Sequence, residues 1–222
     1  MTRRRLVVVS AGLSQPSSTR LLADQLAGAT RTALEDSGIP VDVRVVELRE
    51  YAHDLVNHLL TGFAPQRLRE VLDAVAGADG LIAVTPIFNA SYSGLFKLFF
   101  DVVDGAALAG RPVLMGATGG TARHSLALEH AVRPMFAYLR AATVPTAVFA
   151  ATEDWAASAA DGTLRGRIRR AGRELAGEMA RREPVTVADP FALTSSFEEL
   201  LAGAGRLAED RDLLDGDEVP AT

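Results

Sequence analysis

The chain has 222 residues, of which 48% are hydrophobic and 23% are charged, and its formal net charge is −5 at pH 7. This composition fits one α/β domain of about 150–200 residues with an appendage, and it shows no basic stripe of the kind that binds nucleic acid. The absence of cysteine excludes disulfides, thiolate metal ligands and thiol nucleophiles. The apolar run after Arg3–Arg5 is too short for a signal sequence or a membrane span, so we expect a cytoplasmic protein without a membrane partner.

Strand-like and helix-like patterns alternate along the chain. Apolar or alternating runs predict five strands, at Leu6–Ala11, Val41–Leu48, Leu81–Thr85, Pro112–Ala117 and Val144–Ala150. Helical spacing predicts five helices, at Ser18–Ser37, Pro65–Ala76, Ser91–Val103, Ala122–Ala141 and Leu164–Arg182. The segment Tyr51–Phe63 is predicted to be a long connection.

Strands that alternate with helices predict a doubly wound, five-stranded parallel sheet with helices on both faces. Right-handed crossovers leave few topologies, and the strand order 2-1-3-4-5 is the favoured one. A ligand of such a sheet lies over the carboxyl ends of strands 1, 3 and 4. We therefore expect the functional residues in the loops that follow these three strands.

A change of composition at Glu183-Pro184 divides the chain into a domain over residues 1–182 and an extension over residues 183–222. The extension is predicted to hold a short amphipathic helix, Ser195–Glu209, and to end in an acidic, disordered segment.

The loop after the first strand is rich in hydroxyl groups, with Ser14, Ser17, Ser18 and Thr19 followed by Arg20. A helix start leaves backbone N–H groups unpaired and carries the positive end of the helix dipole, which makes it a natural phosphate site. The alternative is an ordinary helix cap with spare serines. The loop carries few charges, which suits a monophosphate better than a triphosphate. The sequence has neither a P-loop nor a dinucleotide-fold glycine motif, which disfavours both of those folds.

Two further loops complete the set. In the first, Pro86 stiffens the segment 85–94, which either presents backbone groups and an aromatic side chain to a flat ligand or forms a plain turn capped by Ser91 or Ser93. In the other, the pair Gly119-Gly120 allows either close approach to a ligand with positive φ or a sharp turn.

Together these loops resemble the NAD(P)H-dependent FMN reductases of the flavodoxin-like fold, in particular the branch that supplies reduced flavin to two-component monooxygenases. The matching strings are VVVSAGLSQPSSTRLLA, TPIFNASYSGLFKLFFD and GATGGTARHSLALEHAVRP. The resemblance covers roughly residues 5–182 and implies an oxidoreductase that binds FMN and uses NADPH or NADH.

The resemblance also implies roles for individual residues. The phosphate of FMN is expected at Ser10, Ser14, Ser17, Ser18 and Thr19, the isoalloxazine ring at Pro86, Ile87, Phe88 and Asn89, and the ring edge at Thr118, Gly119 and Gly120. Some members of this branch carry a π-helical insertion, and His130 occupies the position of its stacking residue, although an ordinary helix histidine is an equal alternative. Arg123 is a candidate contact for the phosphates of the nicotinamide dinucleotide, or else a surface residue.

No catalytic side chain and no metal site are expected, because the flavin itself carries the redox chemistry. Alternatives are a quinone, azo-dye or metal-ion reductase with bound FMN, and a flavodoxin-type electron carrier. A phosphoacceptor receiver domain is disfavoured, because Ser10 and Thr85 stand where it needs acidic residues. Finally, Phe96, Phe99 and Phe100 exceed what one helix face buries in a monomer, which predicts a homodimer or homotetramer.

Overall fold

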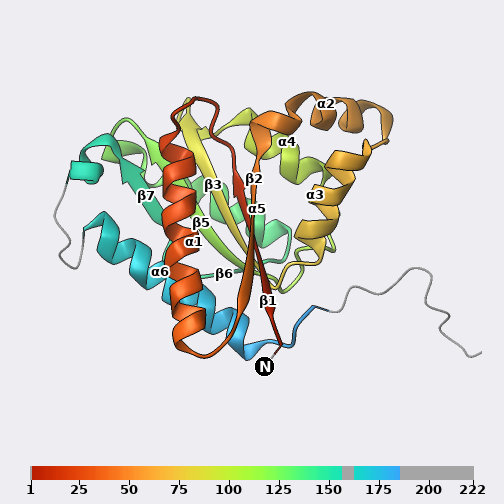
Figure 1. Ribbon diagram of the computed structural model, residues 1–222. Coiled ribbons are helices and arrows are strands. Elements are labelled where there is room, and N and C mark those ends of the chain that lie inside the picture. The colour runs from red at the N-terminus through yellow and green to blue at the C-terminus, as the bar shows by residue number, and fades with distance from the viewer. Residues whose placement is uncertain (1, 157–162, 186–222) are drawn as a thin grey trace, which may run out of the picture. The chain divides into compact units, whose positions relative to one another are not determined.

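A computed structural model of the chain describes residues 2–156 and 163–185 (Figure 1). The predicted helix at 195–209 and the acidic end lie outside these residues. The main sheet is parallel and has the order β2-β1-β3-β5-β6, with β7 also paired to β5. Its longer strands are β1 (Arg4–Ser10), β2 (Val41–Glu47), β3 (Gly80–Phe88) and β5 (Pro112–Gly119).

Both faces of the sheet are buried, which is why the central strands are almost continuously apolar. Along β1, Leu6 and Val8 point into one core, and Val7 and Val9 point into the other. Figure 1 shows α1 (Ser18–Asp36) and α6 (Leu164–Arg181) together on the first face. The opposite core takes side chains from four helices: α2 (Ala52–Thr61), α3 (Gln66–Ala76), α4 (Gly94–Val102) and α5 (Arg133–Tyr138).

The predicted α/β class and doubly wound architecture are confirmed, but the sheet has seven strands and not five. One extra strand is β4 (Ser91–Tyr92), which pairs antiparallel with the end of β3. The other is β6 (Ala142–Thr143), which lies just before the strand predicted at Val144–Ala150, and that strand is itself shortened to β7 (Val148–Ala151). Pro145 lies in the gap and has no N–H to donate to a ladder.

Two further predictions of secondary structure, one of a connection and one of a helix, are wrong. The segment predicted as a connection contains a 3-10 turn, Leu48–Tyr51, followed by α2, which ends at Gly62 in a left-handed cap. The helix predicted over Ala122–Ala141 is instead a 3-10 turn (Ala122–His124), a π-helix (Leu128–Val132) and the short α5. Pro134 cannot donate a backbone hydrogen bond to the turn before it, which disrupts regular α-helical pairing at this point.

The three phenylalanines of α4 do not form an exposed surface. Phe96, Phe99 and Phe100 are buried, and their rings pack edge-on against one another and against Phe136 of α5, with the Phe100 and Phe136 centroids 5.0 Å apart. The unexpected helix α2 also packs against α4. The sequence argument for an oligomer from these residues is therefore wrong, because the chain's own helices cover them.

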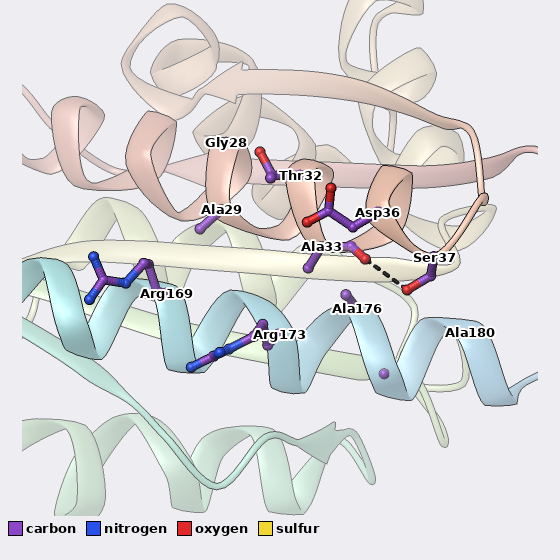
Figure 2. Close-up of a pocket in the computed structure, with 11 residues that line it drawn as sticks. Gly28, Ala29, Thr32, Ala33, Asp36, Ser37, Arg169, Arg173, Ala176 and Ala180 are labelled. Atoms are coloured by element: carbon purple, nitrogen blue, oxygen red, sulfur yellow. Dashed lines mark hydrogen bonds between the residues drawn. The ribbon is translucent and has the colours of Figure 1, made fainter. Parts of the chain in front are cut away.

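A groove of about 670 Å³ lies between α1 and α6 (Figure 2). Small residues line much of it, including Gly28, Ala29, Ala33, Ala176 and Gly177. It follows the helix faces, so it does not adjoin the loops at the strand ends.

The helices α1 and α6 pack tightly against each other at Gly172. An added Cβ there would lie 2.8 Å from the Ala29 Cβ and 2.9 Å from backbone atoms of α1. We expect Gly172→Ala to lower the free energy of unfolding by about 1–3 kcal/mol, because the backbone of α1 must move. Gly177→Ala on the same helix meets nothing within 4 Å and should stabilise by about 0.5–1 kcal/mol through helix propensity. Denaturant unfolding of the two variants measures this difference, and equal effects would contradict it.

Candidate functional site

A cavity of about 400 Å³ lies at the carboxyl ends of β1, β3 and β5. The strand order reverses between β1 and β3, and doubly wound proteins bind their ligands at this switch point. Ten of the thirteen residues predicted to bind cofactor line it: Ser14, Ser17, Ser18, Thr19, Pro86, Ile87, Phe88, Thr118, Gly119 and Gly120. The fold thus brings all three predicted loops together around one space.

The first loop ends in a capped helix start. The Ser17 hydroxyl accepts a hydrogen bond from the backbone N–H of Arg20 at 3.2 Å, which makes Ser17 the N-cap of α1. The turn is tight: a Cβ on Gly12 would lie 2.1 Å from Ser17 Oγ. Ser18 is exposed beside this cap. The unpaired N–H groups of the first turn of α1 and these hydroxyls form a donor set that fits a phosphate.

Buried hydroxyls connect the loops. Thr19 Oγ1 and Thr118 Oγ1 lie 2.8 Å apart, joining the first turn of α1 to the end of β5. Ser10 does not line the cavity; it is buried at the end of β1, and its hydroxyl has no partner among the described residues. Ser10 is therefore the one residue of the predicted phosphate set that does not line the cavity.

The second loop is a two-residue β-hairpin between β3 and β4. Asn89 and Ala90 both have positive φ, 51° and 66°, as a type I′ turn requires. Thr85 fixes the base of the hairpin, because its hydroxyl accepts from the backbone N–H of Ser93 and donates to the Pro86 carbonyl. Asn89 does not line the cavity; its position in the turn gives it a structural reason for being asparagine. Phe88, beside it, is half-exposed at the cavity wall.

The glycine pair of the third loop matters because it has no side chains, and not because of unusual backbone angles. Neither Gly119 nor Gly120 has positive φ. A Cβ on Gly119 would lie 2.9 Å from the Phe149 ring, whereas a Cβ on Gly120 meets nothing within 4 Å. Gly119 therefore lets β5 pack beside β7, and Gly120 leaves open space on the cavity side.

Arg123 and His130 lie in a second cavity, of about 380 Å³, together with Ala90 from the hairpin turn. His130 is exposed and belongs to the π-helix Leu128–Val132, so the π-helical segment implied by the family resemblance is present. Next to it, hydrogen bonds from Arg133 to the Glu129 carboxylate lower the pKa of Glu129. Arg133 also donates to the Val144 carbonyl, which fixes the π-helix against the broken edge strand.

Sequence reasoning missed two residues of the main cavity, Leu13 and Thr152. Thr152 directly follows β7, so the rule that sites form at carboxyl strand ends would have found it. Leu13 is a single apolar residue in a polar loop and carries no comparable signal. Across the described residues, no three His, Asp or Glu side chains converge as a metal site. No described helix is long and apolar enough to cross a bilayer.

A doubly wound sheet with hydroxyl donors at one side of its switch-point cavity and a hairpin at the other defines a flavodoxin-like, nucleotide-binding α/β protein. The chain belongs to the NADPH-dependent FMN reductase family, whose model matches residues 4–156.

Individual relatives agree with this assignment. The chain is 40% identical over 151 residues to an FMN reductase (NADPH) of Pseudomonas aeruginosa, covering 68% of this chain and 78% of that protein. It is 39% identical over 149 residues to the NADH-dependent FMN reductase SfnF of Pseudomonas putida, covering 67% and 78%. Among solved structures, an oxidoreductase from Corynebacterium diphtheriae has a TM-score of 0.79 and 45% identity, covering 82% of this chain and 99% of that one.

The hairpin turn leads to a prediction at Asn89. Asn89→Val should lower the free energy of unfolding by about 1–2 kcal/mol, because a β-branched residue resists positive φ. Asn89→Gly, which accepts that angle freely, should leave stability close to that of the parent chain. Thermal unfolding of both variants tests this, and equal losses would mean that the asparagine side chain, and not the turn, is what matters.

Proposed function

We propose that FMN lies in the switch-point cavity with its phosphate at the start of α1 and its ring between the β3–β4 hairpin and the β5 loop, where NAD(P)H reduces it. The observation that carries this proposal is the convergence of the three loops on one cavity of about 400 Å³, within the usual range for small-ligand sites.

When bound, the flavin supplies a ring that accepts hydride from a nicotinamide. The chain's own residues bind and orient. The helix start and the hydroxyls of Ser14, Ser17 and Ser18 hold the phosphate, and the hairpin with Phe88 limits the position of the ring. No protein acid or base is needed for hydride transfer, in agreement with a cavity whose lining residues carry no titratable side chain.

The second cavity, with Arg123 and His130, is our candidate for the nicotinamide dinucleotide. A guanidinium suits phosphate recognition, including that of a 2′-phosphate. The relatives include proteins named for NADPH and for NADH, so the proposal covers both donors.

A steady-state assay tests the proposal directly. NADH and NADPH are each crossed with FMN, FAD and riboflavin, and oxidation of the nucleotide is followed at the nicotinamide absorbance band. We expect FMN to stimulate oxidation most strongly. If no flavin stimulates oxidation of either nucleotide, the proposed function is wrong.

We also propose that the reduced FMN is passed to a two-component flavin-dependent monooxygenase. Support comes from the resemblance of the three loop strings to that branch of the family. A cytoplasmic location follows from this proposal, because the nicotinamide donors are kept reduced there.

The proposed homo-oligomer now rests on a different surface from the one that the sequence indicated. Val56, Leu59 and Leu60 lie at helical spacing along α2, and Phe63 follows the left-handed cap at Gly62. Leu60 and Phe63 are 78% and 81% exposed. Several exposed, large apolar side chains on one short segment are typical of an interface.

Because both side chains are exposed, the double change Leu60→Glu with Phe63→Glu should leave the fold intact and break the association. Light scattering should then show a fall in mass to the 23.5 kDa monomer. The double change Leu21→Glu with Tyr138→Glu, at exposed apolar residues that line neither the main cavity nor the second one, serves as the control. A parent chain that is already monomeric would contradict the proposed oligomer.

A further inference from the structure

The proposed phosphate site lacks a positive charge of its own. Every residue that lines the main cavity is neutral, including the hydroxyl-bearing residues of the first loop. The N-terminus of α1 supplies only about half an elementary charge. A phosphate group at this position therefore depends strongly on how well the neutral donors of the loop are held in place.

In the sequence, Arg20 is the cation next to the proposed phosphate loop. In the structure, its guanidinium pairs with Asp24 and Glu47. Its Nε lies 2.8 Å from Asp24 Oδ1, and its Nη1 lies 2.5 Å from Glu47 Oε1. The Asp24 hydrogen bond is the largest of the effects that raise the pKa of Arg20. Two carboxylates thus engage this guanidinium.

The exposed segment Leu13–Pro16 is held not by Arg20 but by Arg49, which follows the end of β2. Arg49, in the 3-10 turn after β2, donates from Nη1 to the Ser14 carbonyl at 3.4 Å. When the Gln15 side-chain amide is oriented so that both its oxygen and its nitrogen find suitable partners, its oxygen accepts from both terminal nitrogens of Arg49. Among the described residues, no other side chain or backbone group hydrogen-bonds to residues 13–16.

Arg49 is itself fixed. Its side chain is only 19% exposed, and its Nη2 lies 3.0 Å from Glu47 Oε2. The two oxygens of Glu47 therefore hold Arg20 on one side and Arg49 on the other. A loop that is ordered before its ligand arrives loses less entropy on binding, which raises affinity.

We propose that Arg49 is a positioning residue that determines specificity for phosphorylated flavin, acting through Ser14 and Gln15 of the phosphate loop. The proposal rests on the function proposed above. It predicts that Arg49 affects the binding of FMN, whose phosphate meets this loop, and not that of riboflavin, which has the same ring but no phosphate.

The test compares two flavins on four proteins by fluorescence quenching: the parent chain, Arg49→Met, Arg49→Lys and Arg44→Met. Arg44 is the matched control, since it is an exposed β2 arginine that donates to the Glu70 carbonyl, away from the loop. We expect Arg49→Met to raise the Kd of FMN about tenfold, the size of one lost hydrogen bond to a charged group, with no change for riboflavin. Arg49→Lys keeps the charge but not the fork that spans two acceptors, so it should recover only part of the loss.

Equal weakening of both flavins in Arg49→Met, or weakening of neither, would overturn the role of Arg49. If Arg49→Lys restored the FMN Kd of the parent chain, the positive charge of Arg49 and not its two-acceptor hydrogen bonding would explain the effect. A parent chain that binds riboflavin as tightly as FMN would instead refute the proposed phosphate site itself, so the two failures are distinguishable. Thermal unfolding of each variant shows that the comparison is made on folded protein.

Discussion

The site depends on one constraint, the right-handedness of the connections between parallel strands. From β1 the chain crosses to β2 on one side of the sheet, and the later strands are added on the other side. The loops after β1 and β3 therefore diverge at their carboxyl ends and leave a space that neither loop fills. The residues that line this space come from the last residues of β3 and β5 and from the segments that follow β1, β5 and β7, and such strand-end positions are where folds of this class place their ligand-binding residues.

The parts of the fold that the sequence predicted well are those where one physical signal dominates. The strands β1, β3 and β5 are buried on both faces, so their apolar runs are unambiguous. The failures occur where two signals compete. The apolar residues of α2 are largely exposed, so the pattern at Tyr51–Phe63 predicts a connection and not a helix. Pro134 lies inside a run that otherwise has helical spacing, so the pattern predicts one continuous helix where Pro134 disrupts it.

The same distinction applies to the site. Hydroxyl-rich and glycine-rich loops are visible in a sequence, and the cavity gathers most of the predicted residues. Contacts between distant segments are not visible. Arg49 reaches Ser14 across 35 positions, and nothing in the pattern around Arg49 separates it from the other arginines of the chain. The role of Arg49 becomes recognisable only when β2 is paired with β1, which brings the turn after β2 beside the loop after β1.

The bond between Thr19 and Thr118 links the start of α1 to the end of β5 through two hydroxyl groups. Either hydroxyl can act as the donor, so the pair can reverse its polarity by rotating two protons while the backbone stays in place. These two walls of the cavity can therefore exchange the roles of donor and acceptor without any change in its shape.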